Sequence, residues 1–252
     1  MTFYELYKAL DAKFPKSLMC EWDNDGIMCA DNLEAPCKKV LISLDVTDEA
    51  VDYAIKNGFD TIISHHPLVF KGQKSLSTLN FTQNKLISLV KSGVRVMSFH
   101  TRLDAAEGGV NDALLAVLGF DKGESDPLDP IGRICNLENE ISLDDFASNV
   151  KKALGTPSIS YVGSRAVKKV YVVGGDGKDL IENAVLCGAD TLLTGNASYN
   201  SMLDADEKGL NVIEAGHFYT ENPVCTVLKK YVLELCENIE IELFNSNKIK
   251  TL

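Results

Sequence analysis

One segment of this chain occurs twice, and the repetition restricts the fold more than any other feature. Residues 38–64 align without a gap with residues 168–194. The alignment keeps the leading lysine pair, a glycine and an Asp-Thr step in register. Each copy reads as an apolar run, an amphipathic helix that ends at the glycine, and a second apolar run. Because so long an ungapped match is improbable by chance, we expect two related lobes.

A third apolar run completes each copy, at 93–98 and at 209–214. Runs that are apolar throughout are typical of strands buried on both faces of a parallel sheet. The sequence therefore predicts an α/β fold of two related lobes with mostly parallel sheets, each built on three parallel strands.

The stretch 121–130, rich in Asp and Pro, is the best linker. We therefore expect a first lobe at 1–125 and a second at 126–252. The C-terminal helix is expected to pack back on the first lobe, so that the lobes interleave.

Helix starts can be read from capping residues. Thr2 with Glu5 fits a capping box, and Thr47 and Ser142 are expected to cap two further helices. A last helix is expected from Thr220, with Pro223 tolerated in its first turn. Shorter strands are expected at 133–137 and 159–162.

Charge and composition exclude several classes of function. The formal net charge is −11, which argues against nucleic acid as the main partner. No apolar run approaches ~18 residues, and the N-terminus reads as a helix rather than a signal peptide, so neither a membrane span nor secretion is expected. The seven cysteines include no CxxC pair and are expected to be reduced thiols of a cytoplasmic protein.

The four histidines of the chain all lie just beyond predicted strands. His65 and His66 follow the second strand of the first lobe, and His100 follows its third strand. His217 stands at the corresponding place in the second lobe. Open α/β sheets bind ligands at this edge, so the histidines are expected to share a functional region.

Two carboxylates complete the candidate metal site, because Asp104 lies four residues after His100 and Glu221 four residues after His217. A mixed nitrogen and oxygen set suits two divalent ions of zinc, iron, manganese, cobalt or nickel. Asp104 is the natural bridging carboxylate. A lone histidine at a strand end is usually a satisfied polar group, but five donors at matched strand ends favour a site. The expected ligands are His65, His66, Asp104, His217 and Glu221.

Four motifs resemble the Nif-three-like family, whose members are also known as GTP cyclohydrolase I type 2 homologues or dinuclear-metal-centre hexameric proteins. The motifs are Glu-Trp-Asp-Asn-Asp-Gly at 21–26, Ser-His-His-Pro-Leu-Val-Phe at 64–70, the stretch from His to Asp at 100–112, and Ala-Gly-His-Phe-Tyr-Thr-Glu at 215–221. The resemblance covers essentially the whole chain and implies the short form of the family. It implies the same five metal ligands and a homohexameric toroid.

The chain departs from the family pattern in two places. Arg102 stands where members usually carry Asn. After Thr-Gly at 194–195, the usual Glu-x-Lys-Tyr-His is replaced by a stretch that contains Asn196, Ser198, Tyr199 and Asn200. None of the five expected metal ligands is lost. However, this stretch lacks the carboxylate, the amine and the imidazole of the family pattern, so the substrate chemistry could differ.

The first functional hypothesis is a metal-dependent hydrolase acting on a nucleotide or a related heterocycle; in its cyclohydrolase version, metal-activated water opens the purine imidazole ring. His100 would be a general acid or base. Arg102, Asn196, Gly174 and Gly175 are candidate substrate-binding residues, the glycines through backbone N–H groups that could meet a phosphate; a plain tight turn is an equal explanation of the glycines.

The alternatives are a two-metal phosphoesterase and a non-catalytic metal-binding or partner-binding protein. A nucleotide-binding regulator without metal ranks last.

Overall fold

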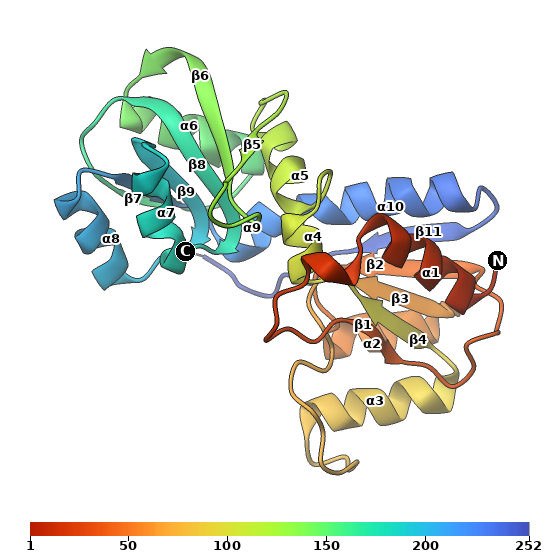
Figure 1. Ribbon diagram of the computed structural model, residues 1–252. Coiled ribbons are helices and arrows are strands. Elements are labelled where there is room, and N and C mark those ends of the chain that lie inside the picture. Colours follow the sequence, from red (N-terminus) through yellow and green to blue (C-terminus); the bar gives the residue numbers. More distant parts are fainter. Residues whose placement is uncertain (252) are drawn as a thin grey trace. The chain divides into compact units, whose positions relative to one another are not determined.

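The computed structural model describes residues 1–251, which form two compact units (Figure 1). Unit 1 comprises Met1–Leu103 and Cys225–Lys248, and unit 2 comprises Asp104–Val224 and the residues that follow Lys248. This division assigns Asp104 to unit 2, whereas the linker expected at 121–130 suggested a boundary at 125/126. The predicted lobes at 1–125 and 126–252 stay a prediction.

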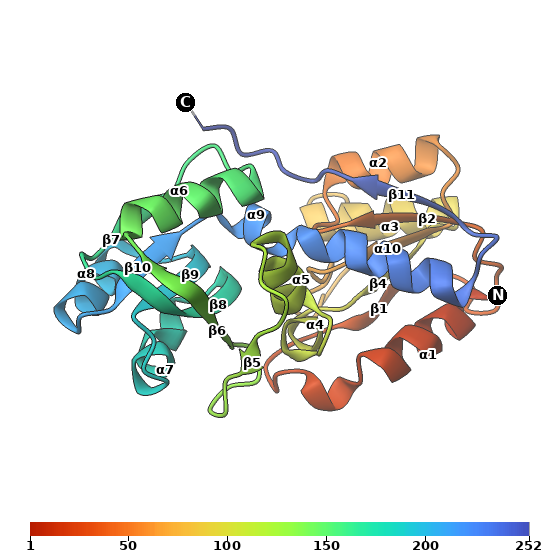
Figure 2. The same ribbon diagram turned by 90° about the horizontal axis from the view of Figure 1, so that it is seen from above.

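Unit 1 is a five-stranded sheet in the order β1-β4-β3-β2-β11. Strands β11, β2, β3 and β4 are parallel, and β1 joins β4 antiparallel. Two views agree that α1 and α10 lie on one side of this sheet and α2 and α3 on the other (Figures 1 and 2). The strands are β1 Gly26–Cys29, β2 Lys39–Ser43, β3 Thr61–Ser64, β4 Arg95–Ser98 and β11 Glu240–Phe244; the helices are α1 Phe3–Lys13, η1 Lys16–Leu18, α2 Asp48–Lys56 and α3 Phe81–Ser92, with α4 Thr101–Ala105 and α10 Pro223–Leu235 at the unit boundaries.

Unit 2 is a six-stranded sheet in the order β5-β6-β8-β9-β10-β7, in which β8, β9 and β10 are parallel. Helices α5 and α6 pack on one face through one apolar cluster, and α7 and α8 pack on the other through a second cluster. The strands are β5 Glu124–Ser125, β6 Arg133–Ile141, β7 Ser160–Val162, β8 Val167–Asp176, β9 Thr191–Asn196 and β10 Asn211–Glu214; the helices are α5 Val110–Val117, α6 Leu143–Leu154, η2 Lys178–Leu180, α7 Ile181–Leu186, α8 Tyr199–Glu207 and α9 His217–Glu221.

The predicted three-strand parallel cores are confirmed as β2-β3-β4 and β8-β9-β10. The predicted caps at Thr2, Thr47 and Ser142 are also confirmed, each accepting a hydrogen bond from the first turn of its helix. The last helix differs from expectation, because α9 ends at Glu221 and a separate helix begins at Pro223. Pro223 lacks the N–H that would continue the ladder, so the chain starts a new helix there.

The aspartate shared by both copies of the repeat ties the start of one strand to the start of the next. Asp60 Oδ2 accepts the backbone N–H groups of Lys38 and Lys39 at 2.8 and 2.9 Å. Asp190 Oδ2 accepts those of 168–169 at 2.9 and 2.7 Å. The following threonine donates to the other carboxylate oxygen in each copy. The two copies of the sequence repeat therefore share the same hydrogen bonds around this aspartate.

The shared glycine ends the helix in both copies. Gly58 and Gly188 lie at φ +72° and +69°, the left-handed region that glycine enters without a Cβ penalty. The residue after each glycine donates its N–H back to the helix, Phe59 to Ala54 and Ala189 to the equivalent alanine. This turn sends the chain directly into the next strand.

No helix among the described residues is long and apolar enough to cross a membrane. No disulfide joins two cysteines among the described residues.

Replacing Asp190 by alanine tests the shared aspartate. The variant leaves two strand amides without their acceptor, so we expect a loss of about 2–3 kcal/mol of unfolding free energy. The matched control is Asp206→Ala on α8, an exposed position where the change is expected to stay within about 0.5 kcal/mol. Urea unfolding followed by circular dichroism measures both, and equal midpoints would contradict the assigned role.

Candidate metal centre

Three imidazoles gather at the carboxyl edge of the unit 1 sheet. His65 and His66 follow β3, and His100 follows β4. Their ring centroids lie 4.9 Å (His65–His66), 5.2 Å (His65–His100) and 5.6 Å (His66–His100) apart. One ring nitrogen of each lies within 4.8 Å of those of the other two. The predicted gathering of first-lobe histidines is therefore present, and this group could hold a metal ion.

Each of these imidazoles has an oxygen partner at Nδ1. His65 Nδ1 lies 2.9 Å from the carbonyl oxygen of Phe99, which can only accept, so His65 carries its proton on Nδ1. His66 Nδ1 lies 2.7 Å from Asp45 Oδ1, and His100 Nδ1 lies 2.7 Å from a carboxylate oxygen of Asp23.

An oxygen partner on one ring nitrogen is the usual outer-shell arrangement of metal-binding histidines, because it fixes the tautomer and leaves the other nitrogen's lone pair for the ion. The donor set of unit 1 therefore fits a divalent transition metal or zinc.

Asp23 anchors the third histidine. Its carboxylate accepts from His100 Nδ1, from the Thr101 backbone N–H at 3.0 Å and from the Thr101 hydroxyl at 2.6 Å. Burial raises the pKa of Asp23, but the hydrogen bonds from His100 and Thr101 outweigh it and hold the pKa well below its usual range. Asp23 is therefore a carboxylate at neutral pH and fixes the orientation of His100.

In unit 2, His217 and Glu221 face each other along α9. His217 Nε2 lies 2.9 Å from Glu221 Oε2, and His217 Nδ1 lies 2.8 Å from Asn196 Oδ1. Glu221 is buried, whereas the side chain of His217 is 40% exposed. The two predicted second-lobe ligands are thus adjacent. Asp104 is half-buried, and its backbone oxygen accepts from the Asn111 side chain at 3.2 Å.

Glycines make room for the Glu221 carboxylate. A Cβ on Gly175 would lie 2.0 Å from Glu221 Oε1, and Gly175 has φ +65°. A Cβ on Gly195 would lie 2.5 Å from Thr220 Oγ1. Only glycine lets α9 approach the ends of β8 and β9 this closely. The sequence pattern suggested phosphate binding for Gly175 and missed this role.

The amides of the glycine stretch already have partners. Gly174 N–H donates to Asn111 Oδ1 at 2.7 Å, Gly175 N–H to Thr220 Oγ1 at 3.1 Å, and Gly177 N–H to Thr194 Oγ1 at 2.9 Å. Phosphate binding at Gly174 and Gly175 stays a prediction that would require these bonds to be exchanged.

Arg102 lies fully buried in unit 1, where its guanidinium bonds to two carboxylates. Nε donates to Asp25 at 2.8 Å, and one terminal nitrogen donates to Asp11 and to the Phe14 carbonyl oxygen. These contacts favour a structural role. The predicted contact with substrate stays untested, as it does for Asn196, which is exposed and holds His217.

Sequence reasoning missed the partners of the histidines. Asp45 follows β2 at the same sheet edge as His66, so its place at a strand end was a usable signal. Asp23 lies in a loop with no periodic pattern, and only the resemblance drew attention to its motif.

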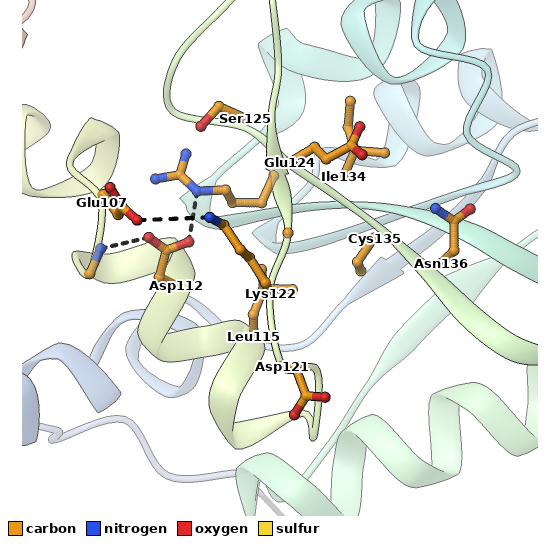
Figure 3. A pocket seen from close by; sticks show the side chains of 13 residues that line it. Glu107, Asp112, Leu115, Asp121, Lys122, Glu124, Ser125, Ile134, Cys135 and Asn136 are labelled. Carbon is orange, nitrogen blue, oxygen red and sulfur yellow. Dashed lines mark hydrogen bonds and ion pairs between the residues drawn. The ribbon is translucent and has the colours of Figure 1, made fainter.

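A separate pocket of about 970 Å³ lies in unit 2 beside β5 and β6 (Figure 3). Its buried cation, Arg133, bonds to Asp112 at 2.8 Å and to backbone carbonyls including those of Ala105 and Ala106. Among the described residues, the side chains that line it include none of the predicted metal ligands. Arg133 is committed to these contacts, and Lys122, the other cation of the lining, lies 3.9 Å from Glu107 Oε1.

The chain is an α/β protein with two sheets. The imidazole group at the strand ends of the unit 1 sheet is its candidate metal centre. The family model for Duf34/NIF3 (NGG1p interacting factor 3) matches residues 1–251, and the chain belongs to this family.

Known relatives agree with this assignment. A GTP cyclohydrolase 1 type 2 homolog of Clostridium perfringens is 33% identical over 258 residues, covering 99% of this chain and 98% of that protein. A protein of the same name from Clostridium acetobutylicum is 34% identical over 226 residues, covering 86% of this chain and 84% of that protein. The crystal structure of a Bacillus cereus protein related to NIF3 has the same fold, with a TM-score of 0.91, 24% identity and coverage of 100% and 99%. The resemblance and the fold class read from the sequence are confirmed.

The close approach of Gly175 to the Glu221 carboxylate allows a test of Glu221 as a metal ligand. Gly175→Ala should displace the Glu221 carboxylate and reduce the metal content of the purified protein. Gly188→Ala is the control, because it also places alanine at positive φ (+69°) but meets only Lys169 Nζ at 4.0 Å. Both variants should lose about 1–2 kcal/mol of stability, and only Gly175→Ala should lose metal in elemental analysis. Equal metal content in both would remove Glu221 from the ligand set.

Proposed function

We propose that this chain is a metal-dependent hydrolase resembling GTP cyclohydrolase I type 2. In this proposal His65, His66, Asp104, His217 and Glu221 hold two divalent ions of zinc, iron, manganese, cobalt or nickel. The observation that carries the proposal is the imidazole group of unit 1: His65 and His66 each have an oxygen partner at Nδ1, and His100 lies beside them with its Nδ1 held by Asp23. The name of the Clostridium perfringens relative supports the choice of reaction.

The residues supply positioning and proton transfer. Two divalent ions, when bound, lower the pKa of a bound water towards neutrality and polarise the atom that is attacked. His100, held through Nδ1 by the Asp23 carboxylate, keeps Nε2 available to take a proton from the attacking water and return it to the leaving nitrogen. Ring opening leaves a formamide, and a second water with the same proton transfer cleaves the remaining C–N bond and releases formate. Asp23 stabilises the imidazolium that forms in between, because it stays ionised.

The proposal has further parts, of which the assembly follows from the resemblance, the location from the cysteines and the role of Arg102 from its contacts. The chain would assemble as a homohexameric toroid, take a small-molecule or nucleotide ligand, and work in the cytoplasm. Arg102 would act by fixing the loop that carries His100, through its bonds to Asp25 and Asp11.

A non-catalytic metal-binding protein is the second candidate. Asn196 favours it, because an amide oxygen accepts the His217 Nδ1 proton where the family pattern places a carboxylate. A neutral amide stabilises a positively charged imidazole less than a carboxylate does, so His217 is poorly supported as an acid–base group.

Metal analysis tests the proposal first. The purified protein should contain about two metal ions per chain, and His65→Ala/Asp104→Ala should lose them together with any release of formate from GTP. Asp206→Ala, an exposed carboxylate on α8, is the control and should behave as the parent protein. Metal without turnover would favour another substrate or the non-catalytic candidate, and no metal after reconstitution under reducing conditions would overturn the proposal.

His100→Gln separates proton transfer from metal binding. We expect unchanged metal content and a fall in turnover of about 10²–10⁴-fold, the usual contribution of a general acid or base. A loss of metal on substitution would instead make His100 a ligand. Elemental analysis and formate release measured on the same preparation distinguish the two.

A further inference from the structure

Two exposed aromatic side chains border the imidazole group of unit 1. Trp22 is 64% exposed and Phe70 is 45% exposed. Their ring centroids lie 6.1 Å apart in an edge-to-face arrangement with an interplanar angle of 61°. A single exposed apolar side chain is ordinary, whereas exposed apolar side chains that adjoin one another can mark a ligand-binding groove.

Both rings also contact His100. The centroid of Trp22 lies 6.1 Å from that of His100, and the centroid of Phe70 lies 6.3 Å from it. The aromatic pair therefore lies directly beside His100, the side chain that would transfer protons. Trp22, Phe70 and the three histidines all belong to unit 1.

The loops that carry the two rings are fastened together. The Asn24 side chain donates to the backbone oxygen of Val69, which joins the loop of Trp22 to the loop of Phe70. Asp23, next to Trp22, is held by three hydrogen bonds from His100 and Thr101. A pair fixed in this way before binding loses little conformational freedom when a ligand arrives.

We propose that Trp22 and Phe70 form a stacking site for a planar heterocycle, with the purine base of a nucleotide lying against the exposed rings beside His100. Base–aromatic stacking needs an open ring face and little else, which is what this pair offers. The charges that flank it, Glu21 and Lys71, have opposite signs, so ring stacking rather than phosphate charge would select the ligand. This inference rests on the proposed function and names the part of the ligand that the site holds.

The chain provides its own reporter, because Trp22 is its single tryptophan. Titration of the purified protein with guanosine, with excitation at the red edge of tryptophan absorption, should quench the fluorescence saturably. Ribose 5-phosphate, which has the phosphate and lacks the base, should leave it unchanged. Quenching by ribose 5-phosphate alone, or by neither compound, would overturn the stacking site.

Phe70→Leu and Phe81→Leu form a matched pair of variants. Phe81 is 81% exposed on α3 and belongs to the same unit. Phe70→Leu should weaken guanosine binding about 10-fold, the order expected for losing part of a stacked base, while Phe81→Leu should bind as the parent does. Equal affinity in both variants would contradict the proposal. A change in sedimentation of Phe70→Leu without a change in guanosine affinity would assign the pair to contact with a second copy of the chain, which also overturns it.

Metal content and formate release separate this inference from the proposed function. Guanosine binding that depends on Phe70, in a protein that releases no formate from GTP, would leave the stacking site standing and remove the cyclohydrolase reaction. Metal-dependent turnover of GTP with the same KM in the parent and in Phe70→Leu would support the cyclohydrolase reaction and overturn the stacking site.

Discussion

The geometry of each unit depends on one repeated interaction, the carboxylate of Asp60 or Asp190 that accepts two strand amides. Asp190 is buried and Asp60 is half-buried, and a carboxylate removed from water needs hydrogen-bond donors. In both copies the donors come from the start of the preceding strand and from the following threonine. The interaction fixes the register between neighbouring parallel strands. Since register decides where each strand ends, it also decides which side chains reach the carboxyl edge of the sheet.

The fold was predictable because its signals are local and periodic. The apolar runs, the helix-ending glycines and the capping residues each act over a few residues, so the sequence shows them directly. Strands β1 and β11 were not predicted, and both are edge strands whose pairing depends on partners far away in the chain. The split at Pro223 was also missed, because a proline fits the first turn of a helix in the expected scheme and in the observed one.

The candidate site was only partly predictable. The positions of His65, His66 and His100 follow from the strand ends, since the chain leaves each strand at a fixed edge. Their partners do not, because Phe99 supplies a backbone oxygen and Asp23 comes from a loop without periodicity. For the same reason the sequence offered Arg102 only as a candidate substrate-binding residue, because its burial between Asp25 and Asp11 depends on two segments distant in sequence.

The two copies agree in the residues that build the sheets and differ in those that would do chemistry. His65 and His66 have Gly195 and Asn196 as their counterparts, since the same alignment that pairs Ser64 with Thr194 continues by two residues. The glycine opens space for α9, and the asparagine holds His217. This pattern is typical of duplication followed by divergence: the copies share one framework, and the strand end that carries two imidazoles in one copy carries glycine and asparagine in the other.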